Sequence, residues 1–255
     1  MTGDSLKRRL RQGGGQLGIV MMLPSPDVAE IVGQSGIDVA MIDHEHGTGG
    51  VQDFVAQARA LRSSAMRAMV RVPPGDLRHA RRLLDAGCEA IVFPAIDTAE
   101  EAAAAVAACR YPPRGERGAG AGIRAAGYGL DPGYYAPEAE DGRLIVIQIE
   151  SARAVDEIDA ICAVEGVDML LIGPRDLAAS MGLLNAMGDP ALWEKVDHAA
   201  RRVKAAGKYL ASTLRPGRTV GEMFAEGYDL VLAAKDVDFI LDGARGLAAS
   251  ARGAA

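Results

Sequence analysis

Carboxylates follow two apolar runs of the sequence, at the points where each run passes into a helix-like stretch. Residues 144–149 (LIVIQI) precede Glu150, and residues 167–174 (VDMLLIGP) precede Arg175 and Asp176. Both runs are typical of buried strands, and the carboxyl ends of parallel strands lie at one edge of a sheet. Carboxylate oxygens are ligands that a hard divalent cation prefers. The pattern therefore predicts that Glu150 and Asp176 hold a metal ion.

Other polar side chains also stand where apolar runs end. Residues 43–46 (DHEH) close one run, Arg71 closes the next, and Gln148 lies two positions before Glu150. Each has an ordinary structural explanation when taken singly, as a helix N-cap or an ion-pair partner. Together, so many charges at one edge would be costly to desolvate without a cation or an anionic ligand. We expect them to form a functional site.

The elements that must position these residues follow from the hydrophobic pattern. Strands are expected at residues 16–23, 37–43, 67–72, 90–96, 143–150, 167–173, 207–212 and 228–234. Helices are expected at residues 27–36, 51–63, 76–87, 98–110, 152–166 and 192–207, with a C-terminal helix at 235–250. Strands that alternate with helices imply parallel pairing, and eight of them favour a closed (β/α)8 barrel over an open sheet. We expect one α/β domain over residues 1–255, with its chemistry at the carboxyl ends of the strands.

Composition excludes several classes of partner. The net charge is −6 and no basic face is apparent beyond a short arginine-rich opening, so we expect no nucleic-acid partner. No apolar stretch is long enough to cross a bilayer, and the N-terminus lacks the core of a secretion signal. Cys88, Cys109 and Cys162 are an odd set without metal-ligand spacing, which fits a reducing cytoplasm. These features predict a soluble, cytoplasmic protein.

The connection at about residues 111–142 interrupts the regular alternation of strands and helices, because it is long and rich in Gly, Pro and Arg. A functional loop and a solvated excursion both remain open for it. As a functional loop it would contact another subunit or border the active site, where Arg114, Arg117 and Arg124 could meet an anionic substrate.

Six motifs in consistent order resemble the HpcH/HpaI aldolase/citrate lyase family. They are Asp43-x-Glu45-His46-Gly47, Val70-Arg71, Leu84-Asp85-Ala86-Gly87, Arg110-Tyr111-Pro112-Pro113 with Arg117-Gly118, Gln148-x-Glu150, and Gly166-Val167-Asp168 with Ile172-Gly173-Pro174-x-Asp176-Leu177. Each motif is weak alone, but the ordered set from about Gly18 to Gly182 is specific. The resemblance implies a TIM barrel of the phosphoenolpyruvate/pyruvate type, a divalent Mg²⁺, Mn²⁺ or Co²⁺ ion, and a homo-oligomer, either a hexamer or a trimer.

The activity that this resemblance implies is that of a lyase. It would be a metal-dependent aldolase that reversibly cleaves a 4-hydroxy-2-oxo acid to pyruvate and an aldehyde through a metal-stabilised enolate. Arg71 would bond the developing enolate oxygen, and His46 would be the acid/base, since imidazole titrates near neutral pH. The substrate would contact Arg71, Gln148, Arg175 and Asp176, the last two at the expected start of a helix.

Asp85 matches an acid that, in the family, partners the catalytic histidine. It falls near the end of the helix after the third strand, at the opposite end of its own barrel. We hypothesise that it reaches the active site of another protomer. Strand alternation further predicts that His44 and His46 point to one side, with His44 behind or beside the substrate. Glu45 would then face the other way and support the fold or an interface.

Two departures from the family pattern keep alternatives open. Arg175 stands where relatives carry a small or uncharged residue, and a second cation there could admit oxaloacetate. Lys235, at the end of the last strand, could form a Schiff base in a metal-independent aldolase, although the two carboxylates would then lack a purpose. The alternative functions are an oxaloacetate-using decarboxylase, a citrate-synthase or CoA-ester lyase, and a non-catalytic oligomer that binds a small acid.

Overall fold

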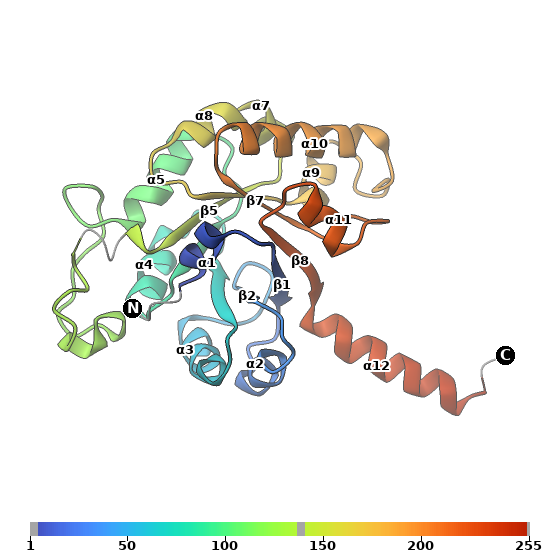
Figure 1. The fold of residues 1–255 in the computed structure, drawn as a ribbon, viewed down its shortest axis with the longest axis horizontal. Helices are drawn as coiled ribbons and strands as arrows, with labels where there is room; N and C mark the ends of the chain where they lie inside the picture. Colours follow the sequence, from blue (N-terminus) through green and yellow to red (C-terminus); the bar gives the residue numbers. More distant parts are fainter. Residues whose placement is uncertain (1–4, 137–140, 254–255) are drawn as a thin grey trace.

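The computed structural model describes residues 5–136 and 141–253. Within these residues, eight parallel strands close into a barrel in chain order, and β8 pairs with β1 (Figure 1). They are β1 (Gln16–Met21), β2 (Val39–Asp43), β3 (Arg67–Arg71), β4 (Ala90–Phe93), β5 (Leu144–Ile149), β6 (Met169–Ile172), β7 (Tyr209–Thr213) and β8 (Leu230–Lys235). The (β/α)8 barrel expected from the sequence is confirmed.

Helices lie between the strands and at both ends of the chain, and most of them cover the outside of the barrel. They are α1 (Leu6–Gln12), α2 (Pro26–Gly33), α3 (Val51–Ala60), η1 (Leu61–Ser63), α4 (Leu77–Asp85), α5 (Ala99–Cys109), η2 (Arg124–Gly129), α7 (Ala152–Asp156), α8 (Ile158–Ala163), α9 (Pro174–Ser180), α10 (Pro190–Ala205), α11 (Val220–Ala225) and α12 (Asp236–Ala251). Side-chain oxygens cap many of their starts, as Ser25, Asp76 and Thr98 do by accepting backbone N–H groups. The stretch expected as one helix at 152–166 is interrupted at Glu157, where the backbone leaves the helical region.

The strands are buried on both faces, which explains why they read as continuous apolar runs. Val39 and Met41 of β2 belong to the cluster inside the barrel, whereas Ala40 and Ile42 pack with the surrounding helices. The arginine-rich opening was not expected to be helical. It forms α1, whose Leu6 and Leu10 join the cluster inside the barrel.

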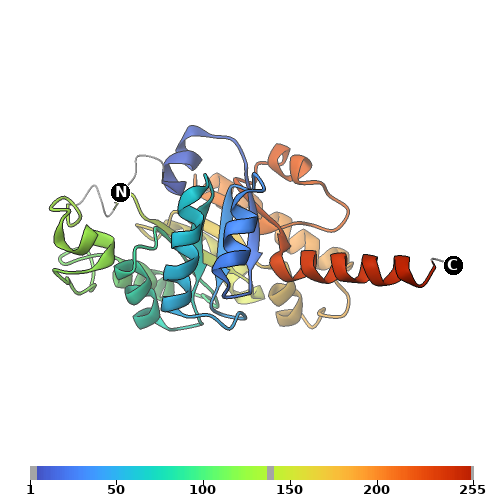
Figure 2. The ribbon, with the colours of Figure 1, turned by 90° about the horizontal axis from the view of Figure 1, so that it is seen from below.

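The last helix, α12, extends away from the barrel in both views (Figures 1 and 2). Asp236 anchors its first turn, because its carboxylate accepts hydrogen bonds from the N–H groups of Met22 (2.9 Å) and Leu23 (3.0 Å). Beyond this turn, Phe239 and Leu247 are exposed. No helix in the described ranges combines the length and the apolar character that crossing a membrane requires.

Candidate active site

Arg71 is the central cation of a cluster at the carboxyl ends of β2 and β3. Its Nε and Nη2 donate to the two oxygens of Asp43, at 3.0 and 2.6 Å, and its Nη1 lies 3.0 Å from Glu45 Oε2. Burial alone would raise the pKa of Asp43, but the hydrogen bonds and charge of Arg71 outweigh it and lower that pKa. The bidentate pair holds the guanidinium plane in one orientation.

The loop after β2 folds back over the end of the strand. Asp43 Oδ1 accepts the backbone N–H groups of Glu45 (3.0 Å) and His46 (3.3 Å). Gly47 is required there, because a Cβ at this position would lie 2.2 Å from the Asp43 carbonyl oxygen. This turn places the His46 side chain at the surface of the site, 56% exposed, with Nε2 3.9 Å from Glu45 Oε2.

The structure differs from the expected alternation of residues 44–46. His44 is buried, and its Nδ1 lies 2.8 Å from Nε2 of His79 on α4, so it does not share the direction of His46. Burial, together with the charge of His79, lowers the pKa of His44 to about 4. Glu45, expected to face away, instead contacts Arg71. The reason is that β2 ends at Asp43, so strand alternation no longer applies.

Glu150 follows β5 and is buried near this cluster. Its Oε1 accepts the backbone N–H of Ala95 (2.6 Å), and its Oε2 accepts a hydrogen bond from Gln148 Nε2. Ala95 has a positive φ of 53°, a conformation uncommon for residues other than glycine, and this turn aims its N–H at the carboxylate. Burial raises the pKa of Glu150, the hydrogen bonds oppose that shift, and the charge of Asp176 adds to it.

Asp176 lies in the first turn of α9, which follows β6, and its charge acts on Glu150. Gly173 separates the strand from this helix. A Cβ at Gly173 would lie 3.1 Å from the Glu150 Cβ and 3.2 Å from Glu150 Oε2. The glycine therefore leaves room beside the carboxylate.

The charges of the rim are unbalanced. The charges of Asp43, Glu45 and Glu150 act on the Arg71 guanidinium, and the charge of Asp176 acts on Glu150. Burial raises the pKa of Glu45, Arg71 opposes this shift, and the charge of Glu150 adds to it. Among the described residues, no group of three or more His, Cys, Asp or Glu side chains has the arrangement of a complete metal cage. A donor set of two carboxylates suits a hard cation that keeps its other positions for substrate and water. The donor set therefore fits a divalent ion at Glu150 and Asp176.

Two further predicted contacts lie at the same rim. Gln148 is buried, and its Oε1 has no hydrogen-bond partner within the described part of the chain. Arg175 is exposed beside Asp176 in the first turn of α9. Both remain available to a ligand that enters from this side.

Asp85 lies at the other end of the barrel, as its place at the end of α4 predicted. Its Oδ1 accepts a hydrogen bond from Arg117 Nη2 at 2.7 Å. Arg117 is 1% exposed, also donates to the Tyr134 hydroxyl (3.0 Å), and lies over the Tyr111 ring. The structure thus gives Asp85 a partner within its own chain that the sequence did not predict.

The loop arginines do not border this chain's own active site. Arg114 pairs with Asp141 (2.9 Å), Arg117 pairs with Asp85, and Arg124 Nη1 donates to the Ala86 carbonyl oxygen. The expectation that they meet a substrate at this barrel's rim is therefore wrong for a single chain. The loop follows α5, and connections from a helix to the next strand lie at the amino-terminal ends of the strands.

Lys235 does not have the surroundings of a Schiff-base lysine. It is exposed at the end of β8, and its Nζ lies 3.6 Å from Asp238 Oδ1 on α12. A nucleophilic lysine needs a desolvated site that lowers its pKa. The exposed ion pair favours the metal-dependent chemistry.

Comparisons with known proteins agree with the geometry. Residues 16–241 match the model of the family described as HpcH/HpaI aldolase/citrate lyase. The chain is 44% identical over 225 residues to a 4-hydroxy-2-oxovalerate aldolase of Novosphingobium aromaticivorans, covering 88% of this chain and 85% of that protein. It is 36% identical over 251 residues to a hydroxypyruvate/pyruvate aldolase of Agrobacterium fabrum, covering 98% and 94%.

A solved structure extends the likeness to the fold. An HpcH/HpaI aldolase/citrate lyase family protein from Burkholderia cenocepacia superposes with a TM-score of 0.92 at 33% identity, covering 98% of this chain and all of that one. With the rim of Arg71, Glu150 and Asp176 in place, the chain belongs to the HpcH/HpaI aldolase/citrate lyase family.

Proposed function

We propose that the protein is a divalent-metal-dependent aldolase that reversibly cleaves a 4-hydroxy-2-oxo acid to pyruvate and an aldehyde. The observation that carries the proposal is the pair of acids, Glu150 and Asp176, at the end of adjacent strands beside Arg71. The aldolase relatives and the family match support the reaction class. Each chain would contribute one barrel domain to this activity.

Glu150 and Asp176 would hold Mg²⁺, Mn²⁺ or Co²⁺. Such an ion, when bound, supplies Lewis-acid stabilisation of the negative charge that develops on the 2-oxo acid. Gln148 orients Glu150 by donating to it, and its own unpartnered Oε1 can receive a donor from the ligand. Arg175 and the N–H groups of the first turn of α9 are suited to a substrate carboxylate.

Arg71 would stabilise the developing oxyanion of the substrate. Its hydrogen bonds to Asp43 use the Nε hydrogen and one hydrogen on Nη2, whereas Nη1 lies 3.0 Å from Glu45 Oε2 as an ion pair without a hydrogen bond. A guanidinium has five N–H donors, so one remains on Nη2 and two remain on Nη1. A donor that is already fixed in place stabilises the transition state without reorganisation.

His46 would move the proton at the aldehyde oxygen. Its ring is accessible from the rim, and the Asp43 carboxylate fixes its backbone N–H at 3.3 Å. Sequence reasoning missed a role for Glu45 at this site. Its carboxylate lies between the His46 imidazole and the Arg71 guanidinium. The pairing of these side chains supports acid/base work at His46.

A homo-oligomer is part of the proposal. The exposed Phe239, Ile240 and Leu247 on the projecting α12 would be covered by a second copy of the chain. In that assembly Asp85 of a neighbouring protomer would support His46, and 38% of its side chain is exposed. The three cysteines are free and buried, which supports the predicted cytoplasmic location.

Metal binding is tested with Glu150→Gln and with the control Glu194→Gln, which removes an exposed carboxylate on α10. At a Mn²⁺ concentration of about 100 Kd, binding stabilises the native protein by about 2.7 kcal/mol. For a chain of this size the melting temperature should then rise by about 5 to 10 °C. Glu194→Gln should keep this rise and Glu150→Gln should lose it.

The reaction is tested by incubating the wild-type protein with pyruvate or oxaloacetate and a panel of aldehydes in the presence of each metal. Carbon–carbon bond formation from pyruvate, lost with EDTA and restored by Mn²⁺, is the expected result. Turnover that persists in EDTA, or a rise in melting temperature that Glu150→Gln retains, would contradict the proposal.

A further inference from the structure

A cavity of about 740 Å³ lies at the amino-terminal end of the barrel, away from the rim of Arg71 and Glu150. Its lining comes from the end of α3 and η1, the starts of β3 and β5, the connection between α4 and β4, and the η2 loop. Five arginines contribute to this lining in the described part of the chain: Arg59, Arg62, Arg67, Arg124 and Arg143. Among the residues that the structure describes, two carboxylates accompany them in the lining, Glu89 and Asp131.

The local charge is opposite to that of the whole chain. Five cationic and two anionic side chains leave an excess of three positive charges in the lining, whereas the chain carries −6. Burial lowers the pKa of Arg124, and the charges of Arg59 and Arg62 lower it further. The guanidinium groups therefore repel one another, and an anion between them would relieve that repulsion.

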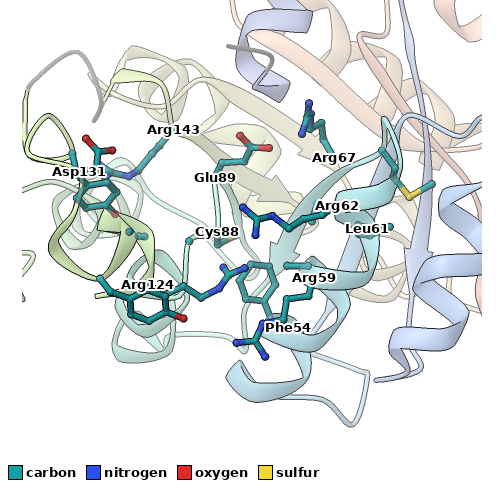
Figure 3. Close-up of a pocket in the computed structure, with 18 residues that line it drawn as sticks. Phe54, Arg59, Leu61, Arg62, Arg67, Cys88, Glu89, Arg124, Asp131 and Arg143 are labelled. Atoms are coloured by element: carbon teal, nitrogen blue, oxygen red, sulfur yellow. The ribbon is translucent and has the colours of Figure 1, made fainter. Parts of the chain in front are cut away.

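Several of these guanidinium groups have N–H donors that make no hydrogen bond within the described residues. The side chains of Arg59 and Arg62 make no hydrogen bond or ion pair with the residues that the structure describes. Arg143 is 3% exposed, and neither of its terminal nitrogens has a hydrogen-bond partner in that same part of the chain. Figure 3 shows Arg62 and Arg124 reaching from opposite walls toward the space between them.

Three aromatic side chains also line the cavity. Phe54 and Tyr134 are buried, whereas Tyr128 is 64% exposed and lines the same cavity. Tyr128 has a φ of 60°, in the left-handed region that favours glycine, which is a strained position for an exposed aromatic residue. A cavity of this volume is larger than a lone anion needs and is within the range of small-molecule sites.

We propose that this arginine cavity binds a nucleotide through its diphosphate group. Arg59, Arg62 and Arg124 would contact the phosphate oxygens, which guanidinium groups recognise well. The ring of Tyr128 would stack on the base, since aromatic side chains accept any base by its face. Within one chain the site is separate from the proposed aldolase site, because its walls are built at the opposite ends of the strands.

The test is calorimetric titration with ADP and with inorganic pyrophosphate, in EDTA so that no metal at the active site can hold the phosphates. Arg59→Gln with Arg62→Gln removes two unpartnered surface cations and should leave the fold intact. We expect at least about tenfold weaker binding of both probes, since each lost charge-assisted hydrogen bond is worth about that factor. The control Arg153→Gln with Arg252→Gln, two exposed arginines elsewhere, should change binding by less than about twofold.

A second variant tests the nucleotide class. Tyr128→Asn tolerates the left-handed backbone and should weaken ADP by about tenfold while leaving pyrophosphate within about twofold. Three results would overturn the proposal: no ADP binding to the wild-type protein, equal binding to the double arginine variant, or pyrophosphate binding without a gain from the nucleoside.

Discussion

Removing the carboxylate of Asp85 should destabilise the protein through Arg117. This guanidinium is almost completely buried, and Asp85 is its ion-pair partner at 2.7 Å. Burial opposes the charge of Arg117, and the hydrogen bond with Asp85 is the largest influence that raises its pKa. Asp85→Asn keeps the shape of the side chain but leaves a buried cation with only the Tyr134 hydroxyl and the neighbouring rings.

The expected size follows from the geometry. Removing one partner of a buried ion pair costs about 3 to 5 kcal/mol, and the partial exposure of Asp85 places this pair at about 3 kcal/mol. The melting temperature should fall by about 6 to 12 °C. Arg117→Met removes the buried charge instead, so Asp85→Asn combined with Arg117→Met should recover at least about half of the loss.

The assay is equilibrium urea unfolding of the wild-type protein, Asp85→Asn, Arg117→Met and the double variant, all at one fixed protein concentration. Pyruvate release per folded protomer is measured below all the transitions. If Asp85 also serves the active site of a neighbour, Asp85→Asn lowers kcat and changes its pH profile, whereas Arg117→Met, which retains the carboxylate, keeps kcat. An unfolding free energy of Asp85→Asn within about 0.5 kcal/mol of wild type would refute the reasoning about the pair.

Three further changes test the active-site rim. The pKa of His44 is depressed to about 4 from an ordinary 6.5, so its contribution to stability is present above pH 6.5 and is lost as the pH falls toward 4. Between pH 6.5 and pH 4 the free energy of unfolding in urea should fall by up to about 3 kcal/mol more for the wild-type protein than for His44→Gln. Parallel plots of this free energy against pH would contradict the assignment. Gly173→Ala should weaken Mn²⁺ binding in calorimetry roughly tenfold, because its Cβ would press on the Glu150 carboxylate, and unchanged affinity would show that the space is not needed. Arg71→Lys cannot keep the two hydrogen bonds to Asp43 together with the ion-pair contact to Glu45, so kcat for pyruvate release should fall about 10²- to 10³-fold, with full activity as the opposing outcome.

The barrel could be predicted because its signals are local. Strands buried on both faces need apolar residues at nearly every position, so β5 and β6 stand out in the chain as continuous runs. Capping residues such as Thr98 and Ser151 mark the starts of helices in the sequence. Eight such units in order left few ways to bury the strands, and Glu150 and Asp176 had to fall at the same end.

The contents of the α5–β5 connection could not be predicted in this way. Its Gly, Pro and Arg content indicated only an unusual loop. The contacts of Arg117 with Asp85 and Tyr134, and of Arg124 with Ala86, join positions 17 to 38 residues apart. No periodicity in the chain encodes such pairs, and the arginine cavity is lined by residues of this loop and of α3 that lie far apart in the sequence.

The sequence by itself determined the fold class, the order of the strands and the residue types that stand at their carboxyl ends, because burial and backbone geometry act through neighbours in the chain. Only the tertiary structure decided which way the side chains after β2 turn, that Glu45 joins Arg71 while His44 pairs with His79, and that Ala95 aims its N–H at Glu150. These directions are set where regular strand alternation stops, and there each side chain goes where the surrounding elements leave a partner and space.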